Sequence, residues 1–210
     1  MNFNTIKNFI WTLKNQRAIK NWRKRNFSPP SPELVKHQII KNNSLENCVW
    51  IETGTYYGET TKLLSKISKK IISIEADENL YKLAKKKLGN LKNVEIIHGK
   101  SETLLKNVIE SNKDNDNMCI YLDAHLCHDH LKNIKTYGNE NSATPIKLEL
   151  ELIENFLKNF KKFNVLIDDI RLFNNVFQNY PDKYYLVDWC KRNNLSWEIE
   201  QDIFICKKII

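Results

Sequence analysis

The sequence contains no run of apolar residues approaching the ~18 that a membrane-spanning helix needs. It also has no CxxC pair, no internal repeat and no low-complexity tract. The five cysteines are odd in number, and Cys48, Cys119 and Cys206 lie in or beside apolar runs. This pattern favours reduced, mostly buried thiols and a cytoplasmic protein. Polar residues interrupt the apolar ones near the N-terminus, which is untypical of a cleavable signal peptide.

Acidic residues are scarce in the first 42 residues. That segment carries nine Lys/Arg and one Glu, whereas residues 43–210 carry 24 of each sign, so the net charge of +8 is entirely N-terminal. Basic and apolar residues alternate at helical spacing over residues 2–26. Three interpretations stay open: a helix lying on an anionic membrane, a nucleic-acid patch, or a helix packed on the domain or on a second copy in a homodimer.

We expect a basic helical segment and linker over residues 1–42, followed by one α/β domain over residues 43–210. The linker is the proline-rich stretch 28–32, in which Ser31 is expected to cap the next helix. The domain opens with VWIETGTYYGET, residues 49–60. An apolar run, a glycine-containing turn and a helix start follow one another there. This order is typical of the first unit of a doubly wound sheet, in which ligands bind beyond the carboxyl ends of the strands.

Strands and helices alternate after this opening unit, and one helix is expected from near Pro145 to about Phe160. The predicted strands cover residues 71–75, 94–97, 119–123 and 164–168, and two runs around residues 201–202 form a terminal hairpin. Alternation predicts a parallel sheet with right-handed crossovers, and the hairpin predicts an antiparallel last strand. The expected fold is therefore a doubly wound, mostly parallel, seven-stranded Rossmann-like sheet.

The turn and the second strand indicate a ligand that contains adenosine. Glu75 ends the second strand, where a carboxylate can accept both hydroxyls of a ribose. Gly54 and Gly58 stand four apart without the third glycine of a pyrophosphate-binding loop, which disfavours a nicotinamide-dependent oxidoreductase. Glu52 adds a negative charge that suits a ligand carrying an amine.

Over residues 45–208 the chain resembles the class I S-adenosylmethionine-dependent methyltransferases, whose motif I is similar to ETGTYYGET and whose ribose-binding acid is similar to Glu75. His98-Gly99-Lys100-Ser101 stands where this family often has Gly-Asp-Ser, so Ser101 is the expected adenine contact. The resemblance implies S-adenosylmethionine as cofactor. The residues it assigns to that cofactor are Glu52, Thr53, Gly54, Tyr56, Gly58, Thr60, Glu75, Ala76, Ser101 and Asp123.

A second group of acids follows the later strands. Asp123 ends one predicted strand and Asp168-Asp169 ends the next, so parallel pairing would bring three carboxylates to one rim. Such oxygen ligands suit Mg²⁺. The pattern resembles the macrocin-type metal-dependent sugar O-methyltransferases, which implies a saccharide or sugar-derived acceptor and no nucleic acid. By this resemblance Mg²⁺ would acidify the acceptor hydroxyl, and Asp123 or His125 would remove its proton.

Other interpretations compete with these. A strand-terminal aspartate such as Asp169 can simply cap the following helix. His125, Cys127, His128, Asp129 and His130 suggest zinc, but their crowding makes tetrahedral closure awkward. Residues 126–143 are expected to form a loop over the site. A non-catalytic adaptor that binds membrane or nucleic acid through its basic N-terminus is the alternative function.

Overall fold

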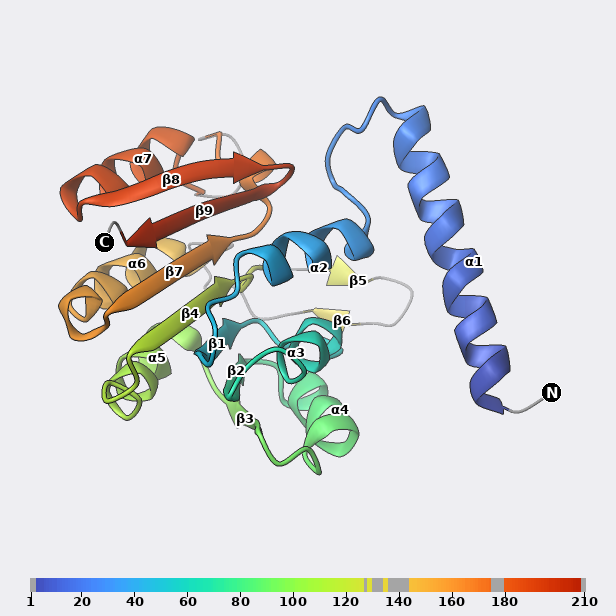
Figure 1. The fold of residues 1–210 in the computed structure, drawn as a ribbon, viewed down its shortest axis with the longest axis horizontal. Helices are drawn as coiled ribbons and strands as arrows, with labels where there is room; N and C mark the ends of the chain where they lie inside the picture. Colours follow the sequence, from blue (N-terminus) through green and yellow to red (C-terminus); the bar gives the residue numbers. More distant parts are fainter. Residues whose placement is uncertain (1–2, 127, 130–133, 136–143, 175–179, 209–210) are drawn as a thin grey trace.

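The computed structural model describes residues 3–126, 128–129, 134–135, 144–174 and 180–208. One sheet has the strand order β3-β2-β1-β4-β7-β9-β8 (Figure 1). Its strands are β1 (Val49–Thr53), β2 (Lys70–Glu75), β3 (Val94–His98), β4 (Asn117–Leu122), β7 (Lys162–Ile167), β8 (Leu195–Glu200) and β9 (Ile203–Lys208). The five strands β3, β2, β1, β4 and β7 are neighbours in that order and pair in parallel. Strand β9 pairs antiparallel with both β7 and β8. The predicted sheet and its terminal hairpin are confirmed.

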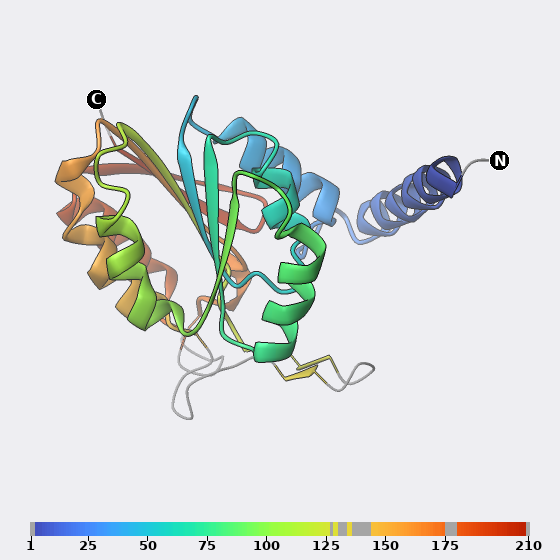
Figure 2. The same ribbon diagram turned by 90° about the horizontal axis from the view of Figure 1, so that it is seen from below.

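Helices cover both faces of this sheet, as Figure 2 shows. The covering helices are α2 (Glu33–Asn42), α3 (Glu59–Leu64), α4 (Glu78–Leu88), α5 (Ser101–Glu110), α6 (Ile146–Glu154) and α7 (Lys183–Arg192), and 3₁₀ turns lie at Leu157–Asn159 and Ile170–Leu172. The first helix, α1 (Phe3–Lys24), does not cover the sheet. A two-stranded pair, β5 (His128–Asp129) and β6 (Ile134–Lys135), lies apart from the sheet. Helix α1 projects from the body beyond α2 (Figures 1 and 2).

The core follows from the two-residue period of the strands. On β1, Val49 and Ile51 face the cluster that α5, α6 and α7 complete, whereas Trp50 faces the cluster that α2 and α3 complete. All five residues of β1 are buried because helices cover both faces of the sheet. Burial on both sides explains why the inner strands are largely apolar runs, whereas the edge strands β3 and β8 are partly exposed and alternate.

Several local expectations need correction. Ser31 does not cap α2: Pro32 occupies the N-cap position, and the buried Ser31 hydroxyl has no hydrogen-bond partner among the described residues. Helix α6 ends at Glu154 and gives way to a 3₁₀ turn, although we expect one helix from near Pro145 to Phe160. In the described part of the chain, no helix is both long enough and apolar enough to cross a bilayer.

Candidate functional site

The predicted site residues lie along the carboxyl edge of the parallel strands. The parallel ladder continues one step past each strand, because Asp123 N–H donates to Thr53 O at 3.1 Å and Asp168 N–H donates to Leu122 O at 3.0 Å. These two bonds place Asp123 beside the end of β1 and Asp168 beside the end of β4. Strand order alone therefore brings acids that are 45 residues apart in sequence to one rim, as we expect for a doubly wound sheet.

A cavity of 180 Å³ opens at this rim, over the ends of β1, β2 and β4. Six of the ten residues assigned to the cofactor line it: Gly54, Tyr56, Glu75, Ala76, Ser101 and Asp123. His125 completes the polar lining, and Ile74, Gly99 and Ala124 contribute the rest. These last three could not be assigned to the cofactor from the sequence, because they have no polar side-chain group that would indicate ligand binding.

Glu75 is held in place by the backbone. Its two carboxylate oxygens accept hydrogen bonds from Tyr56 N–H at 2.7 Å and from Asp77 N–H at 2.9 Å. Burial raises the pKa of Glu75, and these hydrogen bonds partly offset that effect. The backbone donors fix the carboxylate at the cavity wall, with lone pairs left to accept ribose hydroxyls.

The turn after β1 needs a glycine at position 54. Gly54 has φ +86°, and a Cβ built there would lie 2.6 Å from the carbonyl oxygen of Asp123. Only glycine combines this left-handed backbone with so close an approach. The turn and the end of β4 consequently form a continuous wall of the cavity.

The four remaining residues assigned to the cofactor, Glu52, Thr53, Gly58 and Thr60, do not line this cavity. Glu52 is fully buried beneath it and accepts hydrogen bonds from the hydroxyls of Thr61 at 2.5 Å and Ser73 at 2.6 Å. Burial raises the pKa of Glu52 to about 8, so this carboxyl is mostly protonated at neutral pH. Its position is that of a group that fixes β1 to β2 and α3.

The acidic cluster contains its own cations. Lys36 Nζ, on α2, donates to Asp168 Oδ2 at 2.7 Å and to Asp169 Oδ1 at 3.0 Å. Burial lowers the pKa of Lys36, but attraction to Asp168 and Asp169 outweighs this effect and the pKa is raised. Arg171 pairs with Asp169 as well. The sequence gives no signal for Lys36, because it lies on a helix outside the motifs.

These contacts do not fit the predicted Mg²⁺ site at Asp123, Asp168 and Asp169. Asp168 Oδ2 also accepts the hydroxyl of Tyr121 at 2.6 Å, and its Oδ1 accepts the N–H of Asp169 at 2.7 Å. Both oxygens of Asp168 are thus engaged, and an ammonium group stands where the ion would bind. A hard cation would have to displace these donors one by one.

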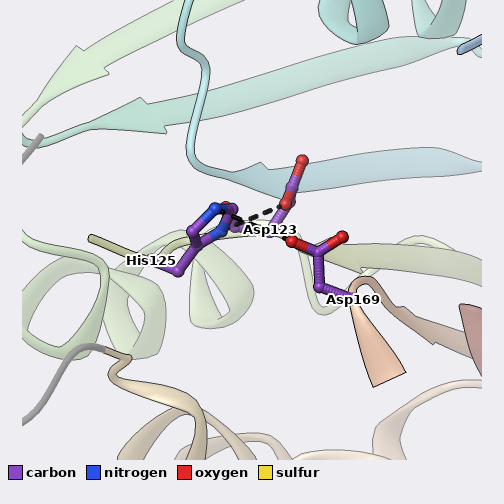
Figure 3. Close-up of side chains that lie close together, drawn as sticks. All are labelled: Asp123, His125 and Asp169. Carbon is purple, nitrogen blue, oxygen red and sulfur yellow. Dashed lines mark hydrogen bonds and ion pairs between the residues drawn. The ribbon is translucent and has the colours of Figure 1, made fainter. Parts of the chain in front are cut away.

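His125 instead joins the carboxylates at the cavity mouth (Figure 3). Its Nδ1 lies 3.4 Å from Asp123 Oδ1, and its Nε2 lies 3.7 Å from Asp169 Oδ2. Burial lowers the pKa of His125, but the hydrogen bond to Asp123 and the neighbouring acids raise it to about 9. Burial and repulsion from Asp168 raise the pKa of Asp123 to about 6. At neutral pH the imidazole is therefore charged, and Asp123 is the better proton acceptor.

A second cavity, of 560 Å³, shares Gly54, Tyr56 and Asp123 with the first. Residues of α1, the linker and α2 form its other wall, among them Lys14, Pro30 and residues 36–37. The suggested zinc cluster and the loop over the site fall mostly outside the described residues, since Cys127 and His130 are not among them.

Comparisons with known proteins agree with this geometry. Residues 25–132, just over half of the chain, match the sequence profile of a family described as ribosomal RNA adenine dimethylase. The chain belongs to that family. The matched segment includes the glycine turn, Glu75, Asp123, His125 and Lys36. It contains every residue that lines the 180 Å³ cavity.

Individual relatives are similar to this chain either over a shorter stretch or at a lower sequence identity. An rRNA adenine N-6-methyltransferase from Escherichia coli is 42% identical over 67 residues, which is 31% of this chain and 27% of that protein. The chain thus matches about a quarter of the length of this relative. The structure of the 23S rRNA methyltransferase ErmE has a TM-score of 0.53 at 14% identity, and the match covers 85% of this chain and 68% of that one.

A second solved structure gives a similar likeness. A Staphylococcus aureus protein proposed to be a caffeoyl-CoA O-methyltransferase has a TM-score of 0.55 at 18% identity, with 98% and 100% of the two chains covered. At such identities the likeness shows the fold alone, which is that of the class I S-adenosylmethionine-dependent methyltransferases.

Two predictions are overturned by the family assignment. The prediction of an O-methyltransferase acting on a saccharide is wrong, because the matching family and the relatives at the sequence level concern adenine of ribosomal RNA. The expectation that no nucleic acid takes part is wrong for the same reason. The wrong prediction rests on Asp123, Asp168 and Asp169, whose short motifs resemble those of the metal-dependent sugar O-methyltransferases.

Proposed function

We propose that this protein transfers a methyl group from S-adenosylmethionine to N6 of adenine in RNA. The observation that carries the proposal is the family match over residues 25–132, which includes every residue that lines the 180 Å³ cavity, Asp123 among them. S-adenosylmethionine supplies the methyl group when bound. The 180 Å³ cavity offers Glu75 for its ribose and Ser101 for its adenine.

The residues at the cavity mouth suit an exocyclic amine. N6 of adenine is a weak nucleophile with two N–H groups, so a site that activates it has to offer hydrogen-bond acceptors and a place for one proton. Asp123 is such an acceptor, since its carboxylate lies at the boundary of the two cavities. His125 orients that carboxylate by its contact at 3.4 Å.

We further propose that Lys36, rather than Mg²⁺, supplies the positive charge among these acids. Lys36 contacts both Asp168 and Asp169, and it also lines the larger cavity. Three clustered carboxylates would repel one another without such a charge. The ammonium group offsets that repulsion from within the chain.

The direct test is methylation of RNA by the full-length protein. Ribosomal RNA and tritiated S-adenosylmethionine are incubated with the protein, and the RNA is digested to nucleosides and separated. The expected product is N6-methyladenosine or N6,N6-dimethyladenosine. Label in another nucleoside only, or none at all, would overturn the proposal.

Asp123→Asn tests the assigned acceptor. We expect this variant to lose about 10²–10⁴-fold in turnover, the range for general acid–base groups. Asp116→Asn is the matched control, because Asp116 is exposed and its carboxylate pairs only with the side chain of Lys161 among the described residues. Equal turnover of the two variants would remove Asp123 from the reaction.

A further inference from the structure

The second half of α1 presents a row of cations to solvent. Its members are Lys14, Arg17, Lys20, Arg23 and Lys24, and all five side chains are exposed. No acidic residue occurs before Glu33, and none of the five forms an ion pair within the part of the chain that the structure describes. We call these five residues the basic stripe. Within the described residues, no carboxylate pairs with these charges.

The other side of this helical segment is less exposed. Asn15, Ala18, Ile19 and Trp22 recur at helical spacing and are less exposed than the basic stripe. Trp22 is 7% exposed and contacts Phe27 edge-on, with ring centroids 5.0 Å apart. An in-plane membrane helix needs an apolar face that is free to enter the lipid. Here the apolar face is partly covered and the charged face is free, which favours a polyanion in water over a bilayer.

The basic stripe leads to the reaction site. Lys14 lines the 560 Å³ cavity together with Gly54, Tyr56 and Asp123, which also line the cofactor cavity. Enzymes that modify a base act on single strands or take the base out of its stack into a pocket. From Lys14 to Lys24 the stripe spans about 15 Å at the 1.5 Å rise per residue of a helix.

We propose that the basic stripe of α1 binds the phosphate backbone of the RNA substrate and directs the target base into the 560 Å³ cavity. This inference rests on the proposed function for the identity of the polyanion. Lysine and arginine side chains bind phosphates with little regard to sequence. The stripe therefore determines affinity, whereas the cavity selects the base.

Charge-matched variants of the full-length protein test this proposal. The stripe variant carries Lys14→Gln, Arg17→Gln, Lys20→Gln and Lys24→Gln. The control carries Lys69→Gln, Lys92→Gln, Lys113→Gln and Lys158→Gln, four exposed lysines that lie shortly before β2, β3, β4 and β7. These four lie toward the opposite edge of the sheet, and both variants lose the same net charge.

The readout is fluorescence anisotropy with a labelled single-stranded RNA oligonucleotide at several salt concentrations. For single strands, log K falls with log salt by about 0.7 per phosphate contacted. Because the stripe variant lacks four cations, the magnitude of its slope should be smaller than that of the wild type by up to about 2.8. It should also bind the RNA at least roughly tenfold more weakly at low salt. The control should keep the slope of the wild type. An equal loss in both variants would refute the stripe as the binding surface.

Two further measurements separate this inference from its competitors. Sedimentation with phosphatidylserine-containing vesicles that depends on the stripe, without any effect on RNA affinity, would assign the stripe to membranes and overturn the proposal. Calorimetry should give unchanged S-adenosylmethionine affinity in both variants. If RNA is bound through the stripe but no adenine is methylated, the proposed function fails and the inference stands. If RNA is methylated equally well by the stripe variant, the inference fails and the function stands.

Discussion

Replacing Glu52 by glutamine is expected to stabilise the protein, and to do so more strongly as pH rises. Glu52 is 1% exposed, and burial raises its pKa from 4.5 to about 8. Between pH 4.5 and about pH 8, Glu52 is ionised in the unfolded chain and protonated in the folded protein. The free energy of unfolding therefore falls by about 1.4 kcal/mol per pH unit through this group.

The sign and size of the effect follow from this linkage. The stability that the protonated carboxyl contributes is fully present below pH 4.5 and is lost as pH rises through about 8. At neutral pH the loss is roughly 3 kcal/mol. A glutamine oxygen can still accept the hydroxyls of Thr61 and Ser73, and the amide has no proton to release in this range. Glu52→Gln therefore avoids the pH-dependent fall in the free energy of unfolding and keeps the hydrogen bonds from Thr61 and Ser73.

The assay is urea unfolding of the wild type, Glu52→Gln and Glu110→Gln between about pH 5 and pH 8. The stability difference between Glu52→Gln and the wild type should grow by about 1.4 kcal/mol per pH unit. Glu110 is exposed, so its variant should show no such trend. A difference for Glu52→Gln that does not change with pH would mean that Glu52 is ionised in the folded protein. The interpretation of this residue as a buried neutral group would then be refuted.

Three further predictions concern the walls of the site. Gly54→Ala should weaken S-adenosylmethionine binding, because the new methyl group would lie 2.6 Å from the carbonyl oxygen of Asp123; unchanged affinity in calorimetry would contradict this. Lys36→Met should lower the free energy of unfolding by about 3 kcal/mol, because it removes the ion pairs that the ammonium group makes with the buried Asp168 and Asp169, whereas exposed Lys41→Met should change it by less than about 0.5 kcal/mol in the same urea assay. Turnover should persist in EDTA if Lys36 supplies the charge, and a loss that added Mg²⁺ restores would reinstate the magnesium site.

The fold could be predicted from the sequence because the inner strands are short, largely apolar runs that end at a turn. The hairpin around Gln201 and Asp202 is recognisable because an alternating run, LSWEIE, and an apolar run, IFIC, flank a tight turn. Helix ends were harder to predict. Ser31 has the chemistry of a cap, yet the chain enters α2 through Pro32 and leaves the hydroxyl of Ser31 without a hydrogen-bond partner in the described part of the chain. Local propensity does not decide how a linker approaches a helix.

Only some of the residues expected to contact the cofactor line the 180 Å³ cavity, and the reason is their position relative to the end of β1. A motif names consecutive residues, but in a doubly wound sheet ligands bind beyond the carboxyl ends of the strands. Gly54 and Tyr56 follow β1 and line the cavity, whereas Glu52 lies within β1 and is buried against Ser73 and Thr61. The prediction of Asp123 and Asp168 at one rim followed from strand order, which parallel pairing determines.

The charge balance of that rim could not be predicted from the sequence, and it changes the chemistry. Lys36 lies 132 residues from Asp168 along the chain, on a helix that belongs to no sheet motif. Only packing of α2 against the sheet, through Ile39 and Ile40, brings its ammonium group to the carboxylates. Without Lys36 the three acids suggest a metal and an activated hydroxyl. With Lys36 and a charged His125 in place, Asp168 and Asp169 are already neutralised, and Asp123 remains as the group that can accept a hydrogen bond and a proton from an amine.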